Sequence, residues 1–409
     1  MNLFDDLWIQ QNSNTTKSFN HIIFTDSLNG WAAGDSGIIV HTTNGGILWQ
    51  IQNTNTINFI YDIRFLNNYI GWAIACNNFA YPNAIFLKTT TAGLNWQKFP
   101  FNDTTLLLFT ICFQNESFGW VAGYGGKILN TTNGGSSWDI TPGDTSQFKF
   151  NSINRIKFYN NRFALACGGF PDLSGVTWKF TNPGSNWFGQ GIAGEPLYDI
   201  AFLDSLTAFL VGGDIDYGLI VLQTTNAGLN WNFNPVYYFG TGKGISFRTN
   251  NEAWVALSYG ASFAVTTNTG QNWFNIPAPN NTILNDVVFT DYRNGWTAGN
   301  NGAIYKFNSA LIGIEHNSKN IDNFFTIYPN YPNPFNPSTN ISFEISKNAN
   351  VQITIFDITG KKITTLVNHL LLPGKYNFQF DGNGLSSGVY LCKINIQNNI
   401  IVQKLVLTK

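Results

Sequence analysis

Short apolar stretches alternate with polar turns along almost the whole chain, and they recur at a regular spacing. Residues 20–24, 37–41 and 286–289 are examples in which hydrophobic and polar positions follow one another within a few residues. Such alternation over four to eight residues is typical of half-buried β-strands. The pattern therefore predicts an all-β fold made of many short strands joined by tight turns.

A tryptophan marks the same point of each repeat. The frame Thr-Thr-Asn-Gly-Gly-Ile-Leu-Trp of residues 42–49 recurs, with changes, in residues 131–138 and 224–231. Its tryptophan is found at Trp49, Trp96, Trp138, Trp187, Trp231 and Trp273. A period of 42–49 residues indicates a solenoid or a propeller.

A second aromatic anchor lies within each period. The frame Gly-Trp-Ala-Ala-Gly of residues 30–34 has relatives whose aromatic position is Trp31, Trp72, Trp120, Phe163, Phe209, Trp254 and Trp296. Seven anchors with four short strands each predict a seven-bladed β-propeller. The last repeat lacks its own Trp strand, and residues 7–11 carry one. We therefore expect the N-terminal strand to complete the seventh blade, which leaves no open edge.

The recurring tryptophans are expected to pack between neighbouring blades. The alternative is a ladder of ligand sites, but every blade would then need the same ligand. The activity should therefore depend on residues that differ between the repeats.

Composition excludes several classes of protein. The formal net charge is −1 and only 11% of residues are charged, so no basic surface for nucleic acid or an anionic membrane is expected. No stretch reaches the roughly 18 apolar residues of a membrane span. Cys76, Cys112, Cys167 and Cys392 are widely spaced and form no Cys-x-x-Cys pair, so they are expected to be buried apolar residues rather than metal ligands. A Cys76–Cys112 disulfide remains open.

The first eight residues lack a basic region followed by an apolar one, so no signal peptide is expected in this chain. A truncated gene start or a mature form would account for this.

The repeat stops near residue 310, and a different pattern follows. Residues 1–310 are predicted to be the propeller, residues 311–325 a polar linker, and residues 326–409 a second domain. The proline-rich stretch of residues 328–339 is expected to be extended. Strands are then expected at residues 340–345, 351–357, 362–366, 374–380, 389–396 and 400–407, forming a small immunoglobulin-like β-sandwich.

Both parts of the chain resemble known families. The frame of residues 42–49 resembles the Asp-box of bacterial neuraminidase repeats, with Asn usually in place of Asp. Together with the Gly-Trp-Ala-Ala-Gly anchor, it resembles more closely the propellers of the photosystem II assembly factor type, over about residues 7–310. This resemblance implies a propeller in which the box is a structural turn on the face opposite the ligand site.

The end of the chain closely resembles the type A C-terminal sorting domain of the type IX secretion system. The residues that carry the resemblance are Pro332, Asn333, Pro334, Phe335, Asn336, Pro337, Gly360, Gly388, Tyr390 and Lys404. The resemblance implies that residues 326–409 bind the type IX secretion machinery. The protein would then be secreted, or anchored at the outer-membrane cell surface, after the tail is removed.

Candidate ligand-binding residues lie in loops that should gather on one face of the propeller. We select an aromatic and acidic set, which suits stacking on a sugar or docking a protein: Tyr124, Lys127, Phe170, Asp172, Asp214, Asp216, Tyr217 and Tyr259. Weaker candidates are Asp35, Tyr81, Asp144, Glu195, Tyr237, Tyr238 and Lys243.

Catalytic chemistry has little support in the sequence. The few arginines do not form the cationic trio that a sialidase needs, and no Ser/His/Asp set, phosphate loop or zinc pattern is present. The pair Asp214 and Asp216 suggests a calcium loop but lacks the remaining ligands of the usual pattern. No metal and no cofactor are therefore predicted.

We expect a secreted or surface-displayed, monomeric, non-catalytic propeller that binds a glycan or a protein. The alternative is a glycoside hydrolase, with a sialidase-like fold, that uses loop carboxylates of the fourth and fifth blades, such as Asp172 and Asp214. A role in assembling a photosynthetic complex is disfavoured by the export signal.

Overall fold

The computed structural model describes residues 7–77, 79–141, 146–160, 163–180, 187–234, 236–309, 325–328, 330–397 and 399–408. They are β-strands, turns and short 3-10 turns, which confirms the all-β prediction. The chain divides into two compact units, Met1–Ser309 and Ala310–Lys409. The predicted linker lies outside the described residues except for Phe325.

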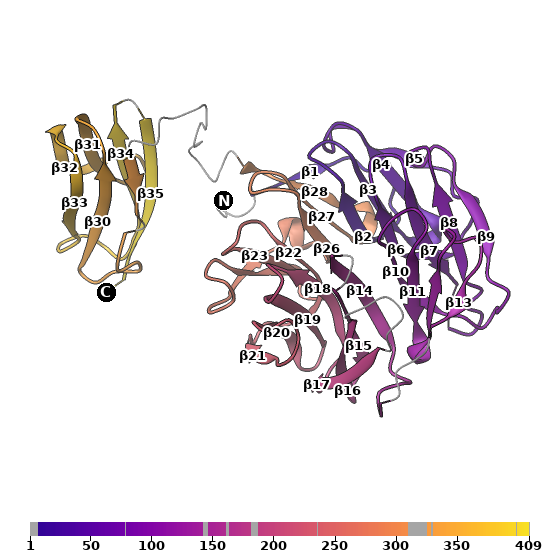
Figure 1. The fold of residues 1–409 in the computed structure, drawn as a ribbon. Coiled ribbons are helices and arrows are strands. Elements are labelled where there is room, and N and C mark those ends of the chain that lie inside the picture. The colour runs from indigo at the N-terminus through magenta and orange to yellow at the C-terminus, as the bar shows by residue number, and fades with distance from the viewer. Residues whose placement is uncertain are drawn as a thin grey trace. The chain divides into compact units, whose positions relative to one another are not determined.

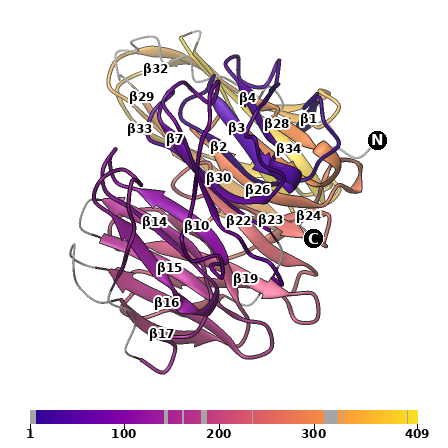
Figure 2. The same cartoon turned by 90° about the vertical axis from the view of Figure 1, so that its right-hand side faces the viewer.

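The described residues of the first unit form seven four-stranded antiparallel sheets (Figures 1 and 2). Each first strand pairs with a second strand, which pairs with a third, which pairs with an outer strand. The first strands are β2 (Phe19–Phe24), β6 (Phe59–Phe65), β10 (Leu108–Phe113), β14 (Ile153–Asn160), β18 (Leu197–Phe202), β22 (Thr241–Phe247) and β26 (Leu284–Phe289). The second strands are β3 (Gly30–Gly34), β7 (Gly71–Cys76), β11 (Gly119–Gly123), β15 (Phe163–Phe170), β19 (Ala208–Asp214), β23 (Ala253–Ser258) and β27 (Gly295–Gly299).

The remaining strands lie further out in each sheet. The third strands are β4 (Ile39–Thr42), β8 (Ile85–Thr89), β12 (Ile128–Thr131), β16 (Ser174–Phe180), β20 (Gly218–Thr224), β24 (Ser262–Thr266) and β28 (Ile304–Phe307). The outer strands are β5 (Gln50–Gln52), β9 (Gln97–Pro100), β13 (Asp139–Ile140), β17 (Phe188–Ala193), β21 (Asn232–Asn234), β25 (Phe274–Pro277) and β1 (Trp8–Gln11). Short 3-10 turns are η1 (Asp35–Gly37), η2 (Tyr124–Gly126), η3 (Pro279–Asn281) and η4 (Asn300–Gly302).

The last sheet is completed by the start of the chain. Strand β1 pairs antiparallel with β28, with Trp8 opposite Phe307 and Gln11 opposite Ile304. The side chain of Trp8 is buried and stacks on Phe263 of the preceding sheet, with ring centroids 5.1 Å apart. A strand about 300 residues away in sequence therefore fills the outer position of this sheet.

An aromatic contact recurs where one sheet meets the next. The anchor ring of each second strand lies against the phenylalanine near the end of the following first strand. Trp31 stacks on Phe65 with centroids 3.6 Å apart, and Trp72 stacks on Phe113 at 3.9 Å. The same contact joins the last sheet to the first, because Trp296 stacks on Phe24 at 3.5 Å. The other pairs are Trp120–Phe158, Phe163–Phe202, Phe209–Phe247 and Trp254–Phe289.

The glycine before the anchor makes room for this phenylalanine. A Cβ atom on Gly30 would lie 2.4 Å from the ring of Phe24, and one on Gly71 would lie 2.5 Å from the ring of Phe65. Real Cβ atoms essentially never approach that closely, so a larger residue would displace the ring. The Gly-Trp pair of the sequence is therefore explained by packing.

The Thr-Thr-Asn-Gly-Gly frame is a hydrogen-bonded turn, as predicted. In its first copy the hydroxyl oxygen of Thr42 accepts the N–H of Gly46 at 3.0 Å, and the amide oxygen of Asn44 accepts the N–H of Leu48 at 2.9 Å. Gly46 has a φ of 92°, which favours glycine. These bonds satisfy the backbone polar groups of the turn.

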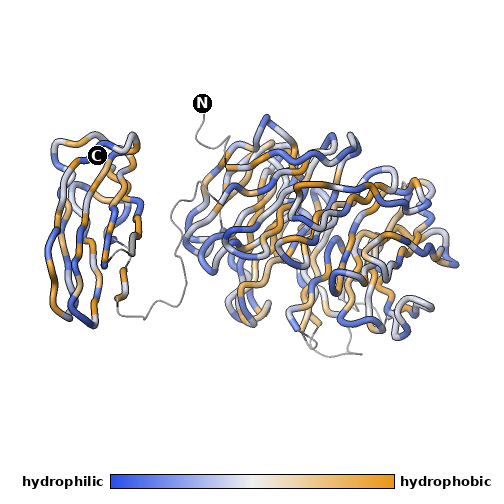
Figure 3. The backbone as a smooth tube through the Cα atoms, turned by 90° about the horizontal axis from the view of Figure 1, so that it is seen from above, coloured by the Kyte–Doolittle hydropathy of each residue, from blue (hydrophilic) through white to orange (hydrophobic). Residues whose placement is uncertain are grey.

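The second unit contains two sheets around one apolar core. Strands β29 (Phe325–Ile327), β30 (Ser338–Ile345) and β33 (Gly374–Asp381) form one sheet. The other follows the order β32 (Lys362–Leu371), β31 (Ala349–Asp357), β34 (Gly388–Ile396) and β35 (Asn399–Leu407). The sequence predicted every strand of this unit except β29. Hydrophobic and hydrophilic segments alternate along the tube in both units (Figure 3).

All four cysteines are free. The sulfur of Cys76 accepts the N–H of Leu108 at 3.2 Å and forms no disulfide with Cys112. Burial raises the pKa of Cys76 to about 12, so its thiol is neutral and packs as a small apolar group.

The contact between the last and first sheets can be tested by mutation. Trp296→Ala should destabilise the first unit by about 3–5 kcal/mol, because it removes a fully buried aromatic ring. Trp31→Ala removes the equivalent ring and should cost a similar amount, measured by urea denaturation with circular dichroism. Phe274→Ala, at a half-exposed position of β25, is the control and should cost less than about 1 kcal/mol. A Trp296→Ala cost equal to the control would contradict the stacked closing contact.

Candidate functional site

Every first strand of the seven sheets in the first unit carries a β-bulge at its second or third residue. In β2, Phe19 pairs with Gly34 and His21 with Ala33, so Asn20 has no partner in the ladder. The equivalent shift occurs in the other six strands. A bulge turns the extra side chain away from the regular alternation of the strand. The bulged residues are Asn20, Tyr61, Phe109, Asn154, Tyr198, Lys243 and Asn285.

The last glycine of the second-strand frame permits this bulge. A Cβ atom on Gly34 would lie 2.1 Å from the carbonyl oxygen of Ser18, and one on Gly123 would lie 2.0 Å from that of Leu107. The residue after each glycine donates its N–H to the same carbonyl, as Asp35 does to Ser18 at 2.9 Å. Glycine therefore allows this close approach of two backbones in five sheets, whereas Ala75 and Leu257 hold the position in the sheets of Tyr61 and Lys243.

The seven bulged side chains line one pocket. Its volume is about 310 Å³, and its only other lining residue is Arg155. Three lining side chains are aromatic and three are amides, whereas the only charged ones are Lys243 and Arg155. One residue from each sheet contributes to this site, which we call the central pocket.

A buried network of charged groups lies next to the central pocket. It is built by the residues that follow the bulges. Arg155 places Nη1 2.9 Å from Asp62 Oδ1 and Nε 3.1 Å from Asp199 Oδ1. His21 lies between Asp286, which its Nδ1 contacts, and Asp62, whose Oδ1 is 3.3 Å from Nε2. Lys157 Nζ lies 2.9 Å from Asp199 Oδ1.

The carboxylates of this network also bind the next sheet directly. Asp62 Oδ2 accepts the N–H of Ile111, Asp199 Oδ2 accepts that of Ile245, and Asp286 Oδ2 accepts that of Ile22, each at 3.0 Å. Burial raises the pKa of Asp62, but Arg64 and Arg155 outweigh it and hold the pKa below its ordinary value. These charges are consequently paired within the protein and stabilise the contacts between sheets.

Lys243 differs from the charges of this network. Its Nζ lies 3.2 Å from the ring centroid of Tyr198, a cation–π contact. Burial, and next the charge of Arg155, lower the pKa of Lys243 to about 7. Burial raises the pKa of Tyr198 to about 12, so the phenol remains neutral.

The predicted aromatic residues partly come together. The rings of Tyr124 and Phe170 lie 5.9 Å apart, and Phe79 contacts Tyr124 at 4.8 Å. Lys127 forms an exposed ion pair with Asp103 at 3.3 Å. None of these residues lines the central pocket.

The predicted acids of the fourth and fifth sheets do come together. One carboxylate oxygen each from Asp172, Glu195 and Asp214 lies within 4.8 Å of the others. Glu195 also accepts the N–H of Asp172 at 2.9 Å, and Asp214 accepts those of Asp216 and Tyr217. Burial raises the pKa of Glu195, and the negative charges of Asp214 and Asp172 raise it as well. Together they outweigh the hydrogen bond from the N–H of Asp172, which lowers this pKa. No other feature of the described residues points to a cation there, so we assign no metal site.

Of the remaining predicted residues, Tyr237 and Tyr238 lie between β21 and β22, and the others that the structure describes lie between second and third strands: Asp35, Tyr81, Tyr217 and Tyr259. Tyr217 and Tyr259 are exposed, and Tyr259 has a φ of 66° in its turn. Asp144 lies outside the described residues. The role of the predicted residues in binding stays a prediction.

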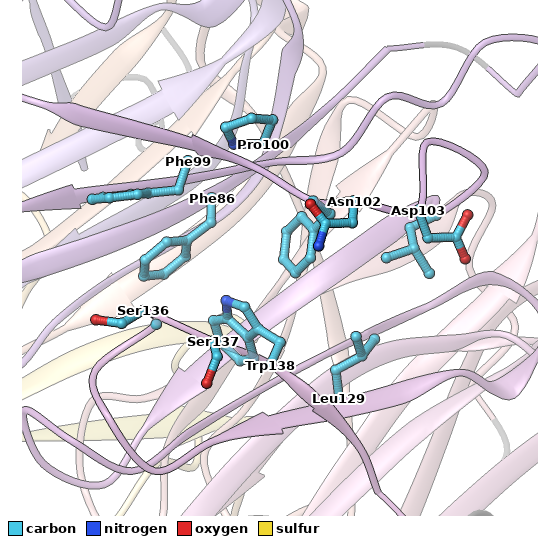
Figure 4. A pocket seen from close by; sticks show the side chains of 12 residues that line it. Phe86, Phe99, Pro100, Asn102, Asp103, Leu129, Ser136, Ser137 and Trp138 are labelled. Carbon is cyan, nitrogen blue, oxygen red and sulfur yellow. The ribbon is translucent and has the colours of Figure 1, made fainter.

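A second cavity lies between two neighbouring sheets, outside the central pocket (Figure 4). Its volume is about 390 Å³, and Phe86, Phe99 and Trp138 contribute to its wall. Phe86 contacts Trp138 with centroids 5.3 Å apart. This cavity is a gap in the repeated aromatic packing, and we assign no ligand to it.

The central pocket was not predicted from the sequence. Of its lining residues, only Lys243 was a weak candidate. A signal was present: the seven first strands align without gaps on their shared Phe, found at Phe24, Phe65, Phe113, Phe158, Phe202, Phe247 and Phe289. The residue four positions before that Phe is an asparagine, an aromatic residue or a lysine in different repeats. This variable position is the bulged residue.

The sorting signature residues of the second unit join the proline-rich segment to the last strand. The amide nitrogen of Asn333 donates to the carbonyl of Lys404, and its amide oxygen accepts the N–H of Val406, both at 2.8 Å. Phe335 is buried beside Phe380 and donates its N–H to Val406. Tyr390 donates its hydroxyl to the carbonyl of Ser386 at 2.8 Å.

The other signature positions form turns and exposed surface. Gly360 has a φ of 83° in the turn after β31, and the carbonyl of Pro337 accepts the N–H of Gly382. The side chains of Pro332, Pro334, Asn336 and Lys404 are exposed, as is Gly388.

Comparison with family models identifies both units. Residues 327–408 match the secretion system C-terminal sorting domain, and residues 102–274 match the photosynthesis system II assembly factor YCF48. The chain therefore combines a β-propeller with a sorting domain. More particularly, its propeller has repeats of the YCF48 type, and its second unit is a type IX sorting domain, which indicates export by that system.

Solved structures support the same architecture. YCF48 from Cyanidioschyzon merolae is 18% identical, with a TM-score of 0.60 over 74% of this chain and 99% of that one. PorZ of Porphyromonas gingivalis, a bacterial surface component of the type IX secretion system, is 14% identical, with a TM-score of 0.56 over 96% of this chain and 60% of that one. The GH74 enzyme of Niastella koreensis is 13% identical, with a TM-score of 0.57 over 97% of this chain and 67% of that one. At these identities the likeness shows the fold alone.

No curated protein sequence matches the chain. Among the described residues, no helix has the length and apolar character needed to cross a membrane.

Ionisation of Glu195 should destabilise the folded protein. Its pKa is raised on folding, so stability is greatest below its unfolded pKa and falls as pH rises through that value to the folded one. Glu195→Gln should therefore raise the melting temperature at pH 7 and leave it almost unchanged near pH 4, by differential scanning calorimetry. Glu116→Gln, at an exposed position, is the control. Equal effects of Glu195→Gln at both pH values would contradict this prediction.

Phe335 should be required for folding of the second unit. Phe335→Ala removes a buried ring and should cost about 3–5 kcal/mol. All 13 tryptophans precede residue 310, so fluorescence reports on the first unit, whereas circular dichroism reports on both. We expect earlier loss of the dichroism signal in urea, with unchanged fluorescence. Tyr331→Ala, at an exposed position of the same segment, should leave both signals unchanged, and equal behaviour of the two variants would contradict the anchoring role.

Proposed function

We propose that this protein is a non-catalytic binding protein, released or displayed at the cell surface after export by its sorting domain. Its first unit acts as a seven-bladed propeller closed by β1, and it is a monomer. The ligand, a glycan or a protein, binds at the central pocket.

The repeated junction supports the closed ring. The anchor of each sheet contacts the Phe of the next, and the pair Trp296–Phe24 has the same stacked geometry as Trp31–Phe65. First strands of neighbouring sheets are also joined by side chain to backbone bonds, including the bond from Ile22 to Asp286. The last and first sheets therefore meet as the other sheets do.

The observation that carries the function is the convergence of the bulged residues on the central pocket. Structural residues repeat between the sheets, but these seven differ: Tyr61, Phe109 and Tyr198 are aromatic, whereas Asn20, Asn154 and Asn285 are amides. Aromatic walls with a few polar groups are typical of ligand sites.

The central pocket also favours binding over catalysis. Its described lining contains no carboxylate, so it offers no acid and base pair. Asp62 and Asp199 of the buried network are held in ion pairs with Arg155 and Lys157, and Asp286 contacts His21, whose pKa burial lowers.

One observation favours the alternative of a glycoside hydrolase. Asp172, Glu195 and Asp214 meet, and a Glu with a raised pKa beside other acids is suited to act as a general acid. However, Glu195 and Asp214 already accept backbone N–H groups, and none of the three lines the central pocket. We therefore keep hydrolysis as the second candidate.

Two similar proteins are consistent with a binding role. One YCF48 structure is described as bound to D1 peptide, and PorZ is a surface component of the type IX secretion system. From these two proteins we infer for this chain only that its propeller binds a partner.

The binding role can be tested with the full-length chain on a glycan array, followed by titration of each bound glycan. Tyr61→Ala should weaken binding about tenfold or more, because it removes an aromatic wall of the central pocket. Tyr237→Ala, on an almost fully exposed tyrosine outside the pocket lining, should leave the affinity unchanged. Hydrolysis of an array glycan that Glu195→Gln abolishes would instead favour the enzyme.

A further inference from the structure

The central pocket contains one cation without a carboxylate partner. Among the described residues, Lys243 Nζ has a contact with the Tyr198 ring and no hydrogen bond or ion pair. Gly244 follows Lys243 at the position where other first strands place a charged or polar side chain. A Cβ atom on Gly244 would lie 2.2 Å from Asp286 Oδ1. The position after Lys243 therefore has no room for an acidic side chain of the same strand that could pair with it.

The three amides of the pocket offer acceptors rather than donors. Asn20 Nδ2 donates to the carbonyl of Ile60 at 3.0 Å, and Asn154 Nδ2 donates to that of Leu197 at 2.9 Å. Asn285 Nδ2 donates to the carbonyl of Phe19 at 2.8 Å. These bonds fix the orientation of each amide, and the three amide oxygens accept no hydrogen bond from the described residues. A ligand that reaches them must therefore bring donors.

We propose that the central pocket binds a carboxylated sugar, such as a hexuronic acid residue of a polysaccharide. The ligand carboxylate pairs with the ammonium of Lys243, the sugar ring lies against Tyr61 or Tyr198, and hydroxyl groups donate to the amide oxygens of Asn20, Asn154 and Asn285. This inference rests on the proposed function and specifies the class of its ligand.

The composition of the pocket discriminates against related ligands. A neutral sugar would satisfy the amides but leave the ammonium group unpaired in a partly desolvated site. An aromatic acid without hydroxyls would pair with Lys243 but leave the amide oxygens without donors, which costs free energy when they are buried. Only a ligand with a carboxylate, several hydroxyls and a flat C–H face satisfies the three kinds of group together.

The binding should depend on pH through Lys243. The titratable and charged groups that line the pocket with it are Tyr61 on β6, Arg155 on β14 and Tyr198 on β18. Asp199 and Asp286 lie against the residues that follow Lys243 on β22, and Asp214 acts on Tyr198 from the end of β19. Each of the three carboxylates has another partner: Asp199 is paired with Arg155 and Lys157, Asp286 contacts His21, and Asp214 accepts the N–H of Asp216 in its own turn. Lys243 is therefore the group whose charge is left for a ligand.

The sign of this dependence follows from linkage. A bound carboxylate raises the pKa of Lys243 above its free value of about 7. The affinity is therefore full below pH 7. Above pH 7 it falls by up to about tenfold per pH unit, until the pKa of the bound state is reached.

The experiment is calorimetric titration of the full chain with glucuronate and galacturonate at pH 6 and pH 8.5. Glucose, galactose and benzoate are the comparison ligands. We expect the uronates to bind at least tenfold more tightly than the neutral sugars and benzoate at pH 6, and more weakly at pH 8.5. Lys243→Gln should lose this preference, whereas Lys243→Arg should keep it at both pH values. Melting temperatures of both variants establish that they fold.

Three results would overturn the inference: absence of uronate binding to the wild type, unchanged uronate affinity in Lys243→Gln, or equal affinity for uronates and neutral sugars. Other results distinguish a failure of this inference from a failure of the proposed function. If a neutral glycan or a peptide binds with an affinity that Tyr61→Ala lowers and Lys243→Gln does not, the pocket is a binding site for another class of ligand. If no glycan or protein binds in a manner sensitive to Tyr61→Ala, both proposals fail.

Discussion

At each junction between neighbouring sheets, an aromatic ring of one second strand lies against the phenylalanine near the end of the next first strand. Trp31–Phe65 and Trp296–Phe24 show its tightest form. The phenylalanine fits because a glycine of its own sheet leaves no Cβ beneath the ring. This contact fixes one end of every first strand. At the other end, a second glycine lets the backbones approach closely at the bulge in five of the seven sheets, and the bulged residues of all seven line the central pocket. The geometry of the candidate site therefore depends on contacts far from any ligand.

The charged groups around the pocket are of two kinds: those with a partner in the buried network, and Lys243. Asp62, Asp199 and Asp286 are buried, and each accepts a backbone N–H of the neighbouring sheet. Asp62 and Asp199 also form ion pairs with arginine or lysine, whereas Asp286 contacts His21; such carboxylates would be costly to bury without partners. Lys243 lies beside this network, and its Nζ lies over the ring of Tyr198 and has no hydrogen bond or ion pair among the described residues. This imbalance, rather than the number of charges, is the basis on which we propose an anionic ligand.

The sorting domain and the candidate site belong to different parts of the chain. In the second unit, Asn333 and Phe335 attach the proline-rich segment to strand β35, while the prolines and Lys404 remain at the surface. The sorting signature thus contains both residues that hold this unit together and residues that are free to contact the secretion machinery. In the first unit, the repeated residues build the sheets, and the residues that vary line the pocket.

The sequence alone determined the all-β fold, the two kinds of unit and the turns, because Trp, Gly and Thr-Asn frames report local packing and backbone conformation that recur with every repeat. It also selected Asp172 and Asp214, which the structure brings together with Glu195. It did not reveal Tyr61, Tyr198 or the role of Lys243. Their positions depend on a bulge, which breaks the alternation from which strand faces are predicted, and on the meeting of seven strands that are distant in sequence. Only the tertiary structure decides which side chains share a pocket and which charges find partners, because both are set by contacts between sheets.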